Sequence, residues 1–118
     1  MYEYRATVLR WVDGDTVDVD IDLGFGVWMR RQRVRLYGIN TPESRTKDLK
    51  EKELGLAAKE FAKSQAPVGK EIYIRTKKDN ETGKYGRILG EIMIDDEISL
   101  NKMLVESGHA VEYFGGKR

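Results

Sequence analysis

The chain of 118 residues contains no cysteine and only one histidine. The absence of cysteine excludes disulfide scaffolds, thiolate zinc sites and cysteine nucleophiles, and it leaves the redox compartment open. Because His109 is the sole histidine, a metal site with two histidines and a relay between two histidines are excluded as well.

The sequence also lacks long apolar runs and a strong charge of either sign. No run approaches the roughly 20 apolar residues that a membrane span requires, and residues 1–5 lack the apolar core of a secretory signal. We therefore expect a cytoplasmic protein, with secretion left open if a signal has been trimmed away. A protein that clamps a polyanion over its whole surface is usually strongly basic, so the net charge of +1 disfavours that class.

What is present predicts one globular domain over residues 1–118. Domains usually contain roughly 100–200 residues, and a chain of this size can bury a core without disulfides or a structural metal. The hydrophobic fraction is 40%, and the apolar residues recur in periodic groups, which is not the pattern of a disordered tail.

The first third of the chain predicts a meander of three strands over residues 2–38. Residues 17–23 alternate apolar and acidic side chains, which is the period of a strand with one buried and one solvated face. Segments 2–11 and 28–37 are also typical of strands, and turn residues separate the three.

A change of period indicates a helix over residues 48–65. Helical spacing relates the apolar side chains at positions 54, 57, 58, 61 and 62. Gly55 inside this helix costs about 1 kcal/mol relative to alanine, which suggests that another backbone segment approaches closely there. Segments 70–76 and 87–94 predict two further strands, and Ser99 is a candidate N-cap for a short second helix.

Five short strands with a helix after the third indicate a small, partly open Greek-key barrel of the OB type. A generic α+β fold is the alternative. The predicted fold class is therefore a β-rich α+β protein, with a five-stranded OB-fold barrel and two helices.

Three stretches could carry chemistry, and each has a purely structural alternative. The turn Asp13-Gly14-Asp15-Thr16 offers carboxylates to a hard cation such as calcium or magnesium, or it only supplies hairpin geometry. Segment 35–43 combines a guanidinium, two oxygen ligands and a carboxylate on a loop, or it is an ordinary entry to the following helix. Segment 84–87 fits a phosphate with a stacked base or sugar, or it is a tight turn.

Together the three stretches supply the parts that phosphodiester hydrolysis needs. The reaction requires a water nucleophile, a group that deprotonates or orients it, and cations around the negative charge of the transition state. Arginine holds phosphoryl oxygens in a bidentate geometry that lysine cannot copy. The residues that could share this work are Asp15, Asn40 and the carbonyl of Thr41 for a metal, Glu43 for the water, and Arg35 and Arg87 for the phosphoryl oxygens.

At these residues the sequence resembles the staphylococcal nuclease (thermonuclease) family. The matching stretches occur in family order and at family spacing over about residues 5–112. They are residues 12–16, 35–43, Gly55 with Ala58 and Phe61, 84–87, and 100–108. The resemblance implies an OB-fold barrel and a calcium-dependent nuclease that cuts DNA and RNA with little sequence preference and leaves a 3′-phosphate.

The resemblance also implies a role for each matching residue. Asp15 corresponds to a metal-ligand carboxylate and Thr41 lends its backbone carbonyl to one Ca²⁺ ion, with Mg²⁺ or Mn²⁺ as alternatives. Glu43 corresponds to the general base, and Arg35 and Arg87 correspond to the arginines that bind the phosphate and stabilise the transition state. Lys84 and Tyr85 match residues that contact the terminal phosphate of a nucleotide. Tyr113 or Phe114 stands at the position of a further family tyrosine.

Two departures from the family pattern carry expectations of their own. Asn40 stands where the family often has a second aspartate ligand, and an amide oxygen still binds calcium or magnesium, so we predict weaker metal binding with activity retained. Staphylococcal nuclease itself carries a third, C-terminal helix that has no counterpart in this sequence. We therefore expect two helices, in a monomer with a less covered lower barrel or in a weak homodimer that covers it.

The predicted metal-dependent nuclease, acting on DNA or RNA, has an alternative from another class. A catalytically inactive nucleic-acid-binding module of the same fold would have lost its site, and the full set of acids and arginines argues against such loss. A protein-interaction domain has no positive support in the sequence. The basic run Arg30, Arg31 and Arg33 is interpreted as a solvated strand face, with tracking of the substrate backbone as the alternative.

Overall fold

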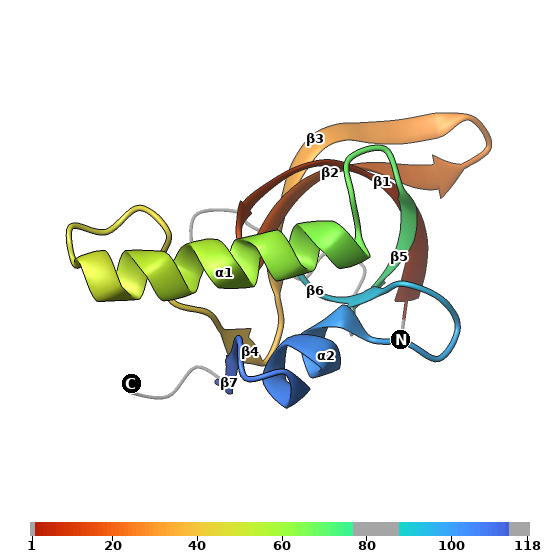
Figure 1. Ribbon diagram of the computed structural model, residues 1–118. Coiled ribbons are helices and arrows are strands. Elements are labelled where there is room, and N and C mark those ends of the chain that lie inside the picture. Colours follow the sequence, from red (N-terminus) through yellow and green to blue (C-terminus); the bar gives the residue numbers. More distant parts are fainter. Residues whose placement is uncertain (1, 77–87, 114–118) are drawn as a thin grey trace.

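The fold, a computed structural model shown in Figure 1, is described for residues 2–76 and 88–113. Its strands are β1 (Tyr2–Asp13), β2 (Thr16–Gly24), β3 (Val27–Leu36), β4 (Ile39–Asn40), β5 (Glu71–Thr76), β6 (Ile88–Met93) and β7 (Val111–Glu112), and its helices are α1 (Leu49–Gln65) and α2 (Leu100–Glu106). Every predicted strand and helix is present, with ends that differ by one or two residues. Position 87, the expected first residue of the last long strand, lies outside the described residues.

Five strands form a closed barrel in the order β1-β2-β3-β6-β5. The β3–β6 pair is parallel and the other neighbours are antiparallel. The predicted five-stranded OB-type barrel with two helices is thus confirmed. The barrel is closed and not partly open, because the long strand β1 pairs with both β2 and β5. A register shift between Val8 and Arg10 is the kind of irregularity that lets one strand bend between two partners.

Strand β2 shows how the alternating sequence builds the barrel interior. Val17, Val19 and Ile21 are buried in the core, while the aspartates between them are only partly covered. Burial of each such apolar side chain contributes about 1.5–3 kcal/mol. The predicted strand with one buried and one solvated face is confirmed.

Helix α1 packs against β1 and α2 through small residues. Its buried positions are Gly55, Ala58 and Ala62. The helical spacing predicted that Leu54 and Ala57 also face the core, but both are exposed, because the face of α1 that meets the core is narrow and consists of small residues together with the partly buried Phe61. Directly after the helix, the indole Nε1 of Trp11 donates a 2.8 Å hydrogen bond to the carbonyl of Ala66.

Helix α2 begins after Ser99, the predicted N-cap, whose hydroxyl accepts the N–H of Lys102. Beyond α2 the chain forms β7, which pairs with β4 in a separate two-stranded sheet. The sequence did not predict this small sheet, because strands of two residues are too short to show a periodic pattern.

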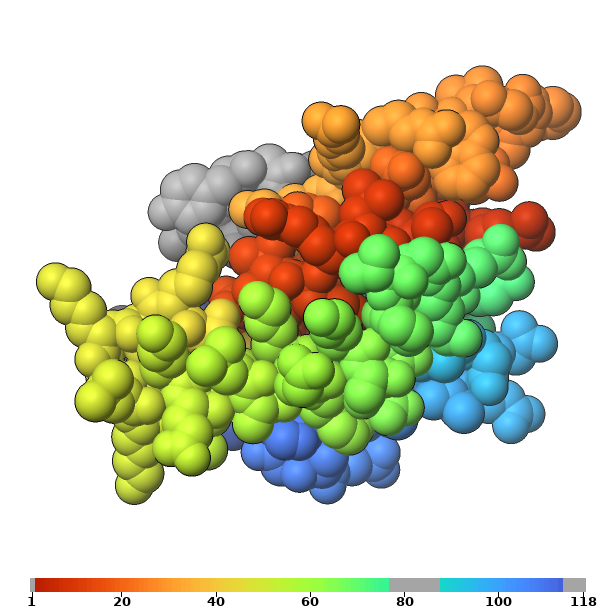
Figure 2. Space-filling model, turned by 45° about the horizontal axis from the view of Figure 1, so that its top comes forward, coloured from red at the N-terminus to blue at the C-terminus, as the bar shows by residue number. Residues whose placement is uncertain are grey.

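Strands β2 and β3 continue beyond the barrel as a hairpin that projects from the body of the molecule (Figure 1 and Figure 2). Its turn consists of Gly24, Phe25 and Gly26, with φ values of 84°, 56° and 76°. The left-handed region suits glycine and is costly for a bulky residue. Phe25 nevertheless occupies it, with its side chain fully exposed at the apex.

Candidate active site

Asp15 lies in the turn between β1 and β2, with its carboxylate buried and hydrogen-bonded. Oδ1 accepts a hydrogen bond from the hydroxyl of Thr16 at 3.0 Å, and Oδ2 accepts one from the backbone N–H of Thr41 at 3.0 Å. The carbonyl of Asp15 accepts the N–H of Leu36 at 2.9 Å. The turn is therefore tied both to the end of β3 and to the loop that follows β4.

Arg35 reaches the same place from β3, where it pairs with Thr16 across the β2–β3 ladder. Its Nη2 lies 3.5 Å from Oδ2 of Asp15 and also donates a hydrogen bond to Oδ1 of Asn40. Its Nη1 donates to the carbonyl of Leu36 at 2.9 Å. The two side-chain contacts hold the guanidinium between a carboxylate and an amide.

The structure thus brings together four of the predicted site residues, Asp15, Arg35, Asn40 and Thr41, in what we call the polar junction. The side chains of Asp15 and Arg35 are only 10% and 14% exposed. Removal of one partner of such an ion pair strongly destabilises the folded protein, because the other charge stays buried without compensation. The hydroxyl of Thr41 is buried with no hydrogen-bond partner among the described residues, which is an uncommon condition for a polar atom.

The donor atoms at the polar junction fit a hard cation in kind. Asp15 offers a carboxylate, Asn40 an amide oxygen and Thr41 a carbonyl and an unpaired hydroxyl, and calcium and magnesium prefer such oxygens. The set carries only one formal negative charge, and the guanidinium of Arg35 contacts both side-chain oxygens. Across residues 2–76 and 88–113, no group of three or more His, Cys, Asp or Glu side chains is placed to hold a metal ion.

Glu43 lies two residues after Thr41 in the loop between β4 and α1, and its side chain is exposed. The structure places its backbone beside Gly55, where an added Cβ would collide with the Glu43 carbonyl and approach the Ser44 nitrogen to 2.7 Å. The predicted close approach of another backbone segment to Gly55 is therefore confirmed.

The remaining predicted site residues are only partly covered by the description. Lys84, Tyr85 and Arg87 lie outside the described residues, so their predicted roles stay predictions. Tyr113 is half-buried directly after β7, and its N–H donates to the carbonyl of Gly38 at 2.7 Å. That bond anchors Tyr113 to the short connection between Arg35 and Asn40.

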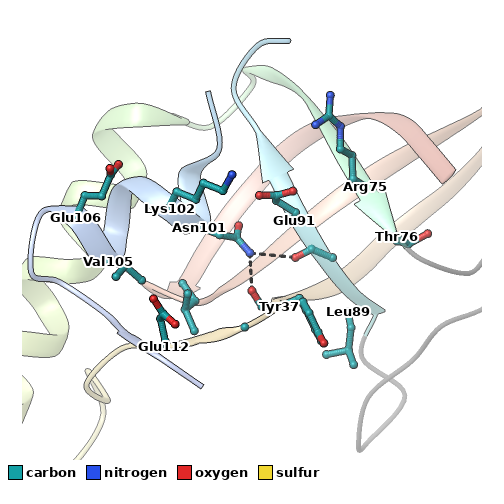
Figure 3. A pocket seen from close by; sticks show the side chains of 13 residues that line it. Tyr37, Arg75, Thr76, Leu89, Glu91, Asn101, Lys102, Val105, Glu106 and Glu112 are labelled. Carbon is teal, nitrogen blue, oxygen red and sulfur yellow. Dashed lines mark hydrogen bonds between the residues drawn. The ribbon is translucent and has the colours of Figure 1, made fainter. Parts of the chain in front are cut away.

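Two cavities flank the small β4–β7 sheet. One of about 560 Å³ lies between the end of β3, β6 and α2, and its walls include Tyr37, Leu89 and Asn101 (Figure 3). The other, of about 470 Å³, is lined by Asn40 and Thr41 together with the first turns of α1. Sequence reasoning named neither Tyr37 nor Asn101 as a site residue, because the burial of Asn101 in α2 is visible only in the structure.

The arginine run of β3 is engaged with the aspartates of β2. Arg33 donates two hydrogen bonds to Asp18, at 2.9 and 3.2 Å, and these bonds hold the pKa of the Asp18 carboxyl below its usual value. Arg30 donates to Asp20 at 3.1 Å and stacks over the ring of Trp28 at 4.8 Å. Cross-strand pairs of this kind stabilise a sheet, which agrees with the interpretation of a solvated strand face.

The chain belongs to the staphylococcal nuclease homologue family, whose model matches residues 33–118. The matched range includes Arg35, Asn40, Thr41 and Glu43, whereas Asp15 precedes it. The resemblance that the sequence motifs predicted is therefore confirmed.

Three similar proteins illustrate the range of relatives. The chain is 34% identical over 104 residues to the thermonuclease of Staphylococcus intermedius, covering 87% of this chain and 56% of that protein. It is 31% identical over 109 residues to the thermonuclease of Staphylococcus hyicus, covering 92% and 59%, and 27% identical over 117 residues to endonuclease YhcR of Bacillus subtilis, covering 95% and 9%. Apart from the much longer YhcR, the chain spans about half the length of these relatives.

Proposed function

We propose that this chain is a metal-dependent nuclease that hydrolyses phosphodiester bonds of DNA and RNA with little sequence specificity and leaves 3′-phosphate ends. The observation that carries the proposal is the polar junction, where a carboxylate, a guanidinium and two oxygen donors converge from three separate elements. Relatives named thermonuclease and endonuclease support the same reaction class.

In this proposal Arg35 binds the phosphoryl oxygens of the scissile phosphate. Its contacts with Asp15 and Asn40 fix the guanidinium before substrate arrives. A preorganised cation at the place where negative charge develops stabilises the transition state without reorganisation during the reaction. Arg87 is proposed as the second arginine of the phosphate.

Glu43 is proposed as the general base. Its exposed carboxylate takes a proton from the attacking water, the water oxygen bonds to phosphorus, and the bond from phosphorus to the 5′ oxygen breaks as that oxygen takes up a proton from solvent water. The products are a 3′-phosphate and a 5′-hydroxyl. Lys84, Tyr85 and Tyr113 are proposed to contact the nucleotide.

Asp15, Asn40 and the Thr41 carbonyl would hold the metal ion, which we propose to be calcium. When bound, such an ion supplies positive charge beside the phosphate. Because the junction contains one carboxylate and already contacts a guanidinium, Asn40→Asp should bind calcium more tightly than the wild type. Calorimetric titration with calcium measures this without any turnover, and equal affinity in the two proteins would contradict it.

The proposed partner is a nucleic acid strand, with the protein acting as a monomer or weak homodimer. Neither helix in the described segments combines the length and the apolar character needed to cross a bilayer. The cytoplasmic location remains a prediction. Gel filtration tests the oligomeric state, and fractionation of cells tests the location.

The central test is digestion of single-stranded DNA and of RNA with calcium and with chelator, using the wild type, Arg35→Ala and Glu43→Ala. We expect cleavage only with the metal ion and at least a 100-fold loss in either variant. The matched controls are Arg5→Ala and Glu53→Ala, which alter exposed side chains of the same types. A gel shift of the products after phosphatase treatment reports the 3′-phosphate.

Two outcomes would overturn the proposal. Unchanged cleavage in Arg35→Ala would remove the polar junction from the reaction. Binding of nucleic acid by the wild type without cleavage under any metal condition would instead support the alternative, an inactive nucleic-acid-binding module.

A further inference from the structure

Both aspartates of the Asp13-Gly14-Asp15 turn bind the backbone of the loop that carries Glu43. Oδ2 of Asp15 accepts the N–H of Thr41 at 3.0 Å, as described above. Oδ1 of Asp13 accepts the N–H of Ser44 at 3.2 Å and also accepts the hydroxyl of Ser44. The two carboxylates therefore hold the loop on either side of Glu43.

Helix α1 holds the same loop through a further hydrogen bond. Oε2 of Glu51, in the first turn of α1, accepts the N–H of Glu43 at 3.2 Å. The carboxylate of Asp48 caps the helix by accepting the N–H groups of Lys50 and Glu51, which fixes the position of that turn. The backbone of Gly55 leaves no room for the Glu43–Ser44 peptide to move toward the helix.

The side chain of Glu43 has no comparable restraint of its own. Its carboxylate is exposed, and it forms no hydrogen bond or ion pair with any other residue in the described segments. The backbone of the loop therefore fixes the point from which the Glu43 side chain extends, and a shift of that backbone moves the carboxylate with it.

We propose that Asp13 and Glu51 are positioning residues that hold the Glu43–Ser44 peptide and thereby direct the Glu43 carboxylate toward the attacking water. The proposal rests on the proposed nuclease function, in which Glu43 is the general base. Asp13 acts through Ser44, and Glu51 acts through the backbone N–H of Glu43. Neither of them touches the substrate.

The substitution Glu51→Gln separates the positioning role of Glu51 from the effect of its charge. A carboxylate near a helix N-terminus is favourable there, and it also accepts hydrogen bonds more strongly than a neutral amide. Glutamine at position 51 keeps an acceptor oxygen at the same reach and removes the charge. Recovery of activity by Glu51→Gln would show that the hydrogen bond to Glu43 is the part that matters.

The experiment compares Glu51→Ala, Glu51→Gln, Asp13→Ala and Asp13→Asn with the wild type under calcium. A misplacement of about 1 Å can cost on the order of 100-fold in rate, so we expect kcat to fall about 10- to 100-fold in the alanine variants with KM nearly unchanged. The amide-type variants should recover most of kcat. Glu53→Ala, an exposed glutamate of the same helix, is the control and should behave as the wild type.

Amide hydrogen exchange at Glu43 and Ser44, followed by NMR, gives a readout that does not depend on turnover. Exchange at Glu43 should accelerate in Glu51→Ala and stay slow in Glu51→Gln, and Ser44 should respond in the same way to the Asp13 variants. Glu51 is partly buried and lies outside the hydrophobic core, so the Glu51 variants keep the test valid even if Asp13→Ala unfolds.

The outcomes separate the two proposals. If the wild type cleaves and Glu51→Ala keeps the wild-type kcat, the positioning role is wrong while the nuclease function stands. Unchanged exchange at Glu43 in Glu51→Ala would also overturn the positioning role, because the contact would then restrain nothing. If the wild type cleaves no nucleic acid, the nuclease function fails, and the catalytic role of the two residues fails with it.

Discussion

The β2–β3 ladder has two ends that differ sharply. At one end, Thr16 pairs with Arg35 beneath the loop between β4 and α1, and the polar side chains are buried and bonded to one another. At the other end, Gly24 pairs with Val27, and the turn presents Phe25 to solvent. The same pair of strands thus buries polar side chains at one end and exposes apolar side chains at the other.

The difference comes from what covers each end. Near Arg35 the barrel closes, and β4 and the following loop bring Asn40 and Thr41 over the ladder. Beyond the barrel only two strands remain, so the side chains of Leu23, Val27 and Met29 are covered on one side at most and are exposed. An ion pair should therefore contribute strongly to stability where later segments of the chain cover it, and only weakly where it stays exposed to solvent.

The largest expected effect is the difference in stability lost when one arginine of β3 is removed from the covered part of the ladder and another from the exposed part. Arg35→Ala leaves Asp15 buried without its partner and should lower the free energy of unfolding by about 3 kcal/mol. Arg30→Ala removes an exposed ion pair with Asp20 and should cost less than about 1 kcal/mol. Urea denaturation of both variants measures the difference, and equal losses would show that burial does not distinguish the two ends.

A smaller effect is expected where α1 supports the covered end. Gly55→Ala adds a methyl group against the backbone of Glu43 and Ser44, and overpacking of this kind costs about 1–3 kcal/mol, which exceeds the gain of about 1 kcal/mol in helix propensity. We expect a net loss of stability by thermal unfolding. The control is Ala57→Gly at an exposed position of the same helix, which reports propensity alone. A stabilised Gly55→Ala would contradict the close contact.

Acidification should reveal the ion pairs of the uncovered part of the ladder. The hydrogen bonds from Arg33 lower the pKa of Asp18 below its ordinary value of 3.8, so the native state favours the ionised carboxyl. That stabilisation is present above pH 3.8 and is lost as the pH falls through the lower folded pKa. The side chain of Arg33 is 44% exposed and solvent screens the pair, so the contribution should be below about 1 kcal/mol.

The measurement for this ion pair is urea denaturation of the wild type and Arg33→Gln at neutral and at acidic pH. The two proteins should differ in stability at neutral pH and converge when Asp18 is protonated. A difference that persists unchanged at low pH would assign the effect to packing of the Arg33 side chain and not to its charge.

The smallest effect is expected at the apex of the hairpin. Phe25→Asn places a residue that tolerates a positive φ where phenylalanine has a φ of 56° and buries nothing. The free energy of unfolding, measured by thermal denaturation, should stay the same or rise slightly, by no more than about 0.5 kcal/mol. A clear loss of stability would mean that Phe25 packs in solution, and the contrast between the two ends would then be weaker than described.

Local patterns predicted much of this structure because local physics determines it. The period of two in residues 17–23 and the helical spacing of residues 48–65 were sufficient for β2 and α1. The motif around Asp15 and the segment from Arg35 to Glu43 predicted where the polar junction would form, and the structure brings four of those residues together.

Other long-range contacts had no local pattern to predict them. Asp13 and Ser44 lie 31 positions apart, and no pattern in either stretch indicates that they meet. The same holds for Glu51, whose place in the first turn of a helix gives no sign of its hydrogen bond to Glu43. The exposure of Leu54 could not be predicted either, because it depends on which face of α1 the barrel accepts.

Asn101 has a consequence for the order in which the chain assembles. Its side chain donates to the carbonyl of Tyr37 at 2.8 Å (Figure 3) and accepts the N–H of Ile92 at 3.0 Å, at the point where β3 and β6 run side by side. These partners come from the first and last thirds of the sequence, so Asn101 can make both contacts only when β3 and β6 lie side by side. Docking of α2 and pairing of β3 with β6 should therefore occur as one cooperative folding event.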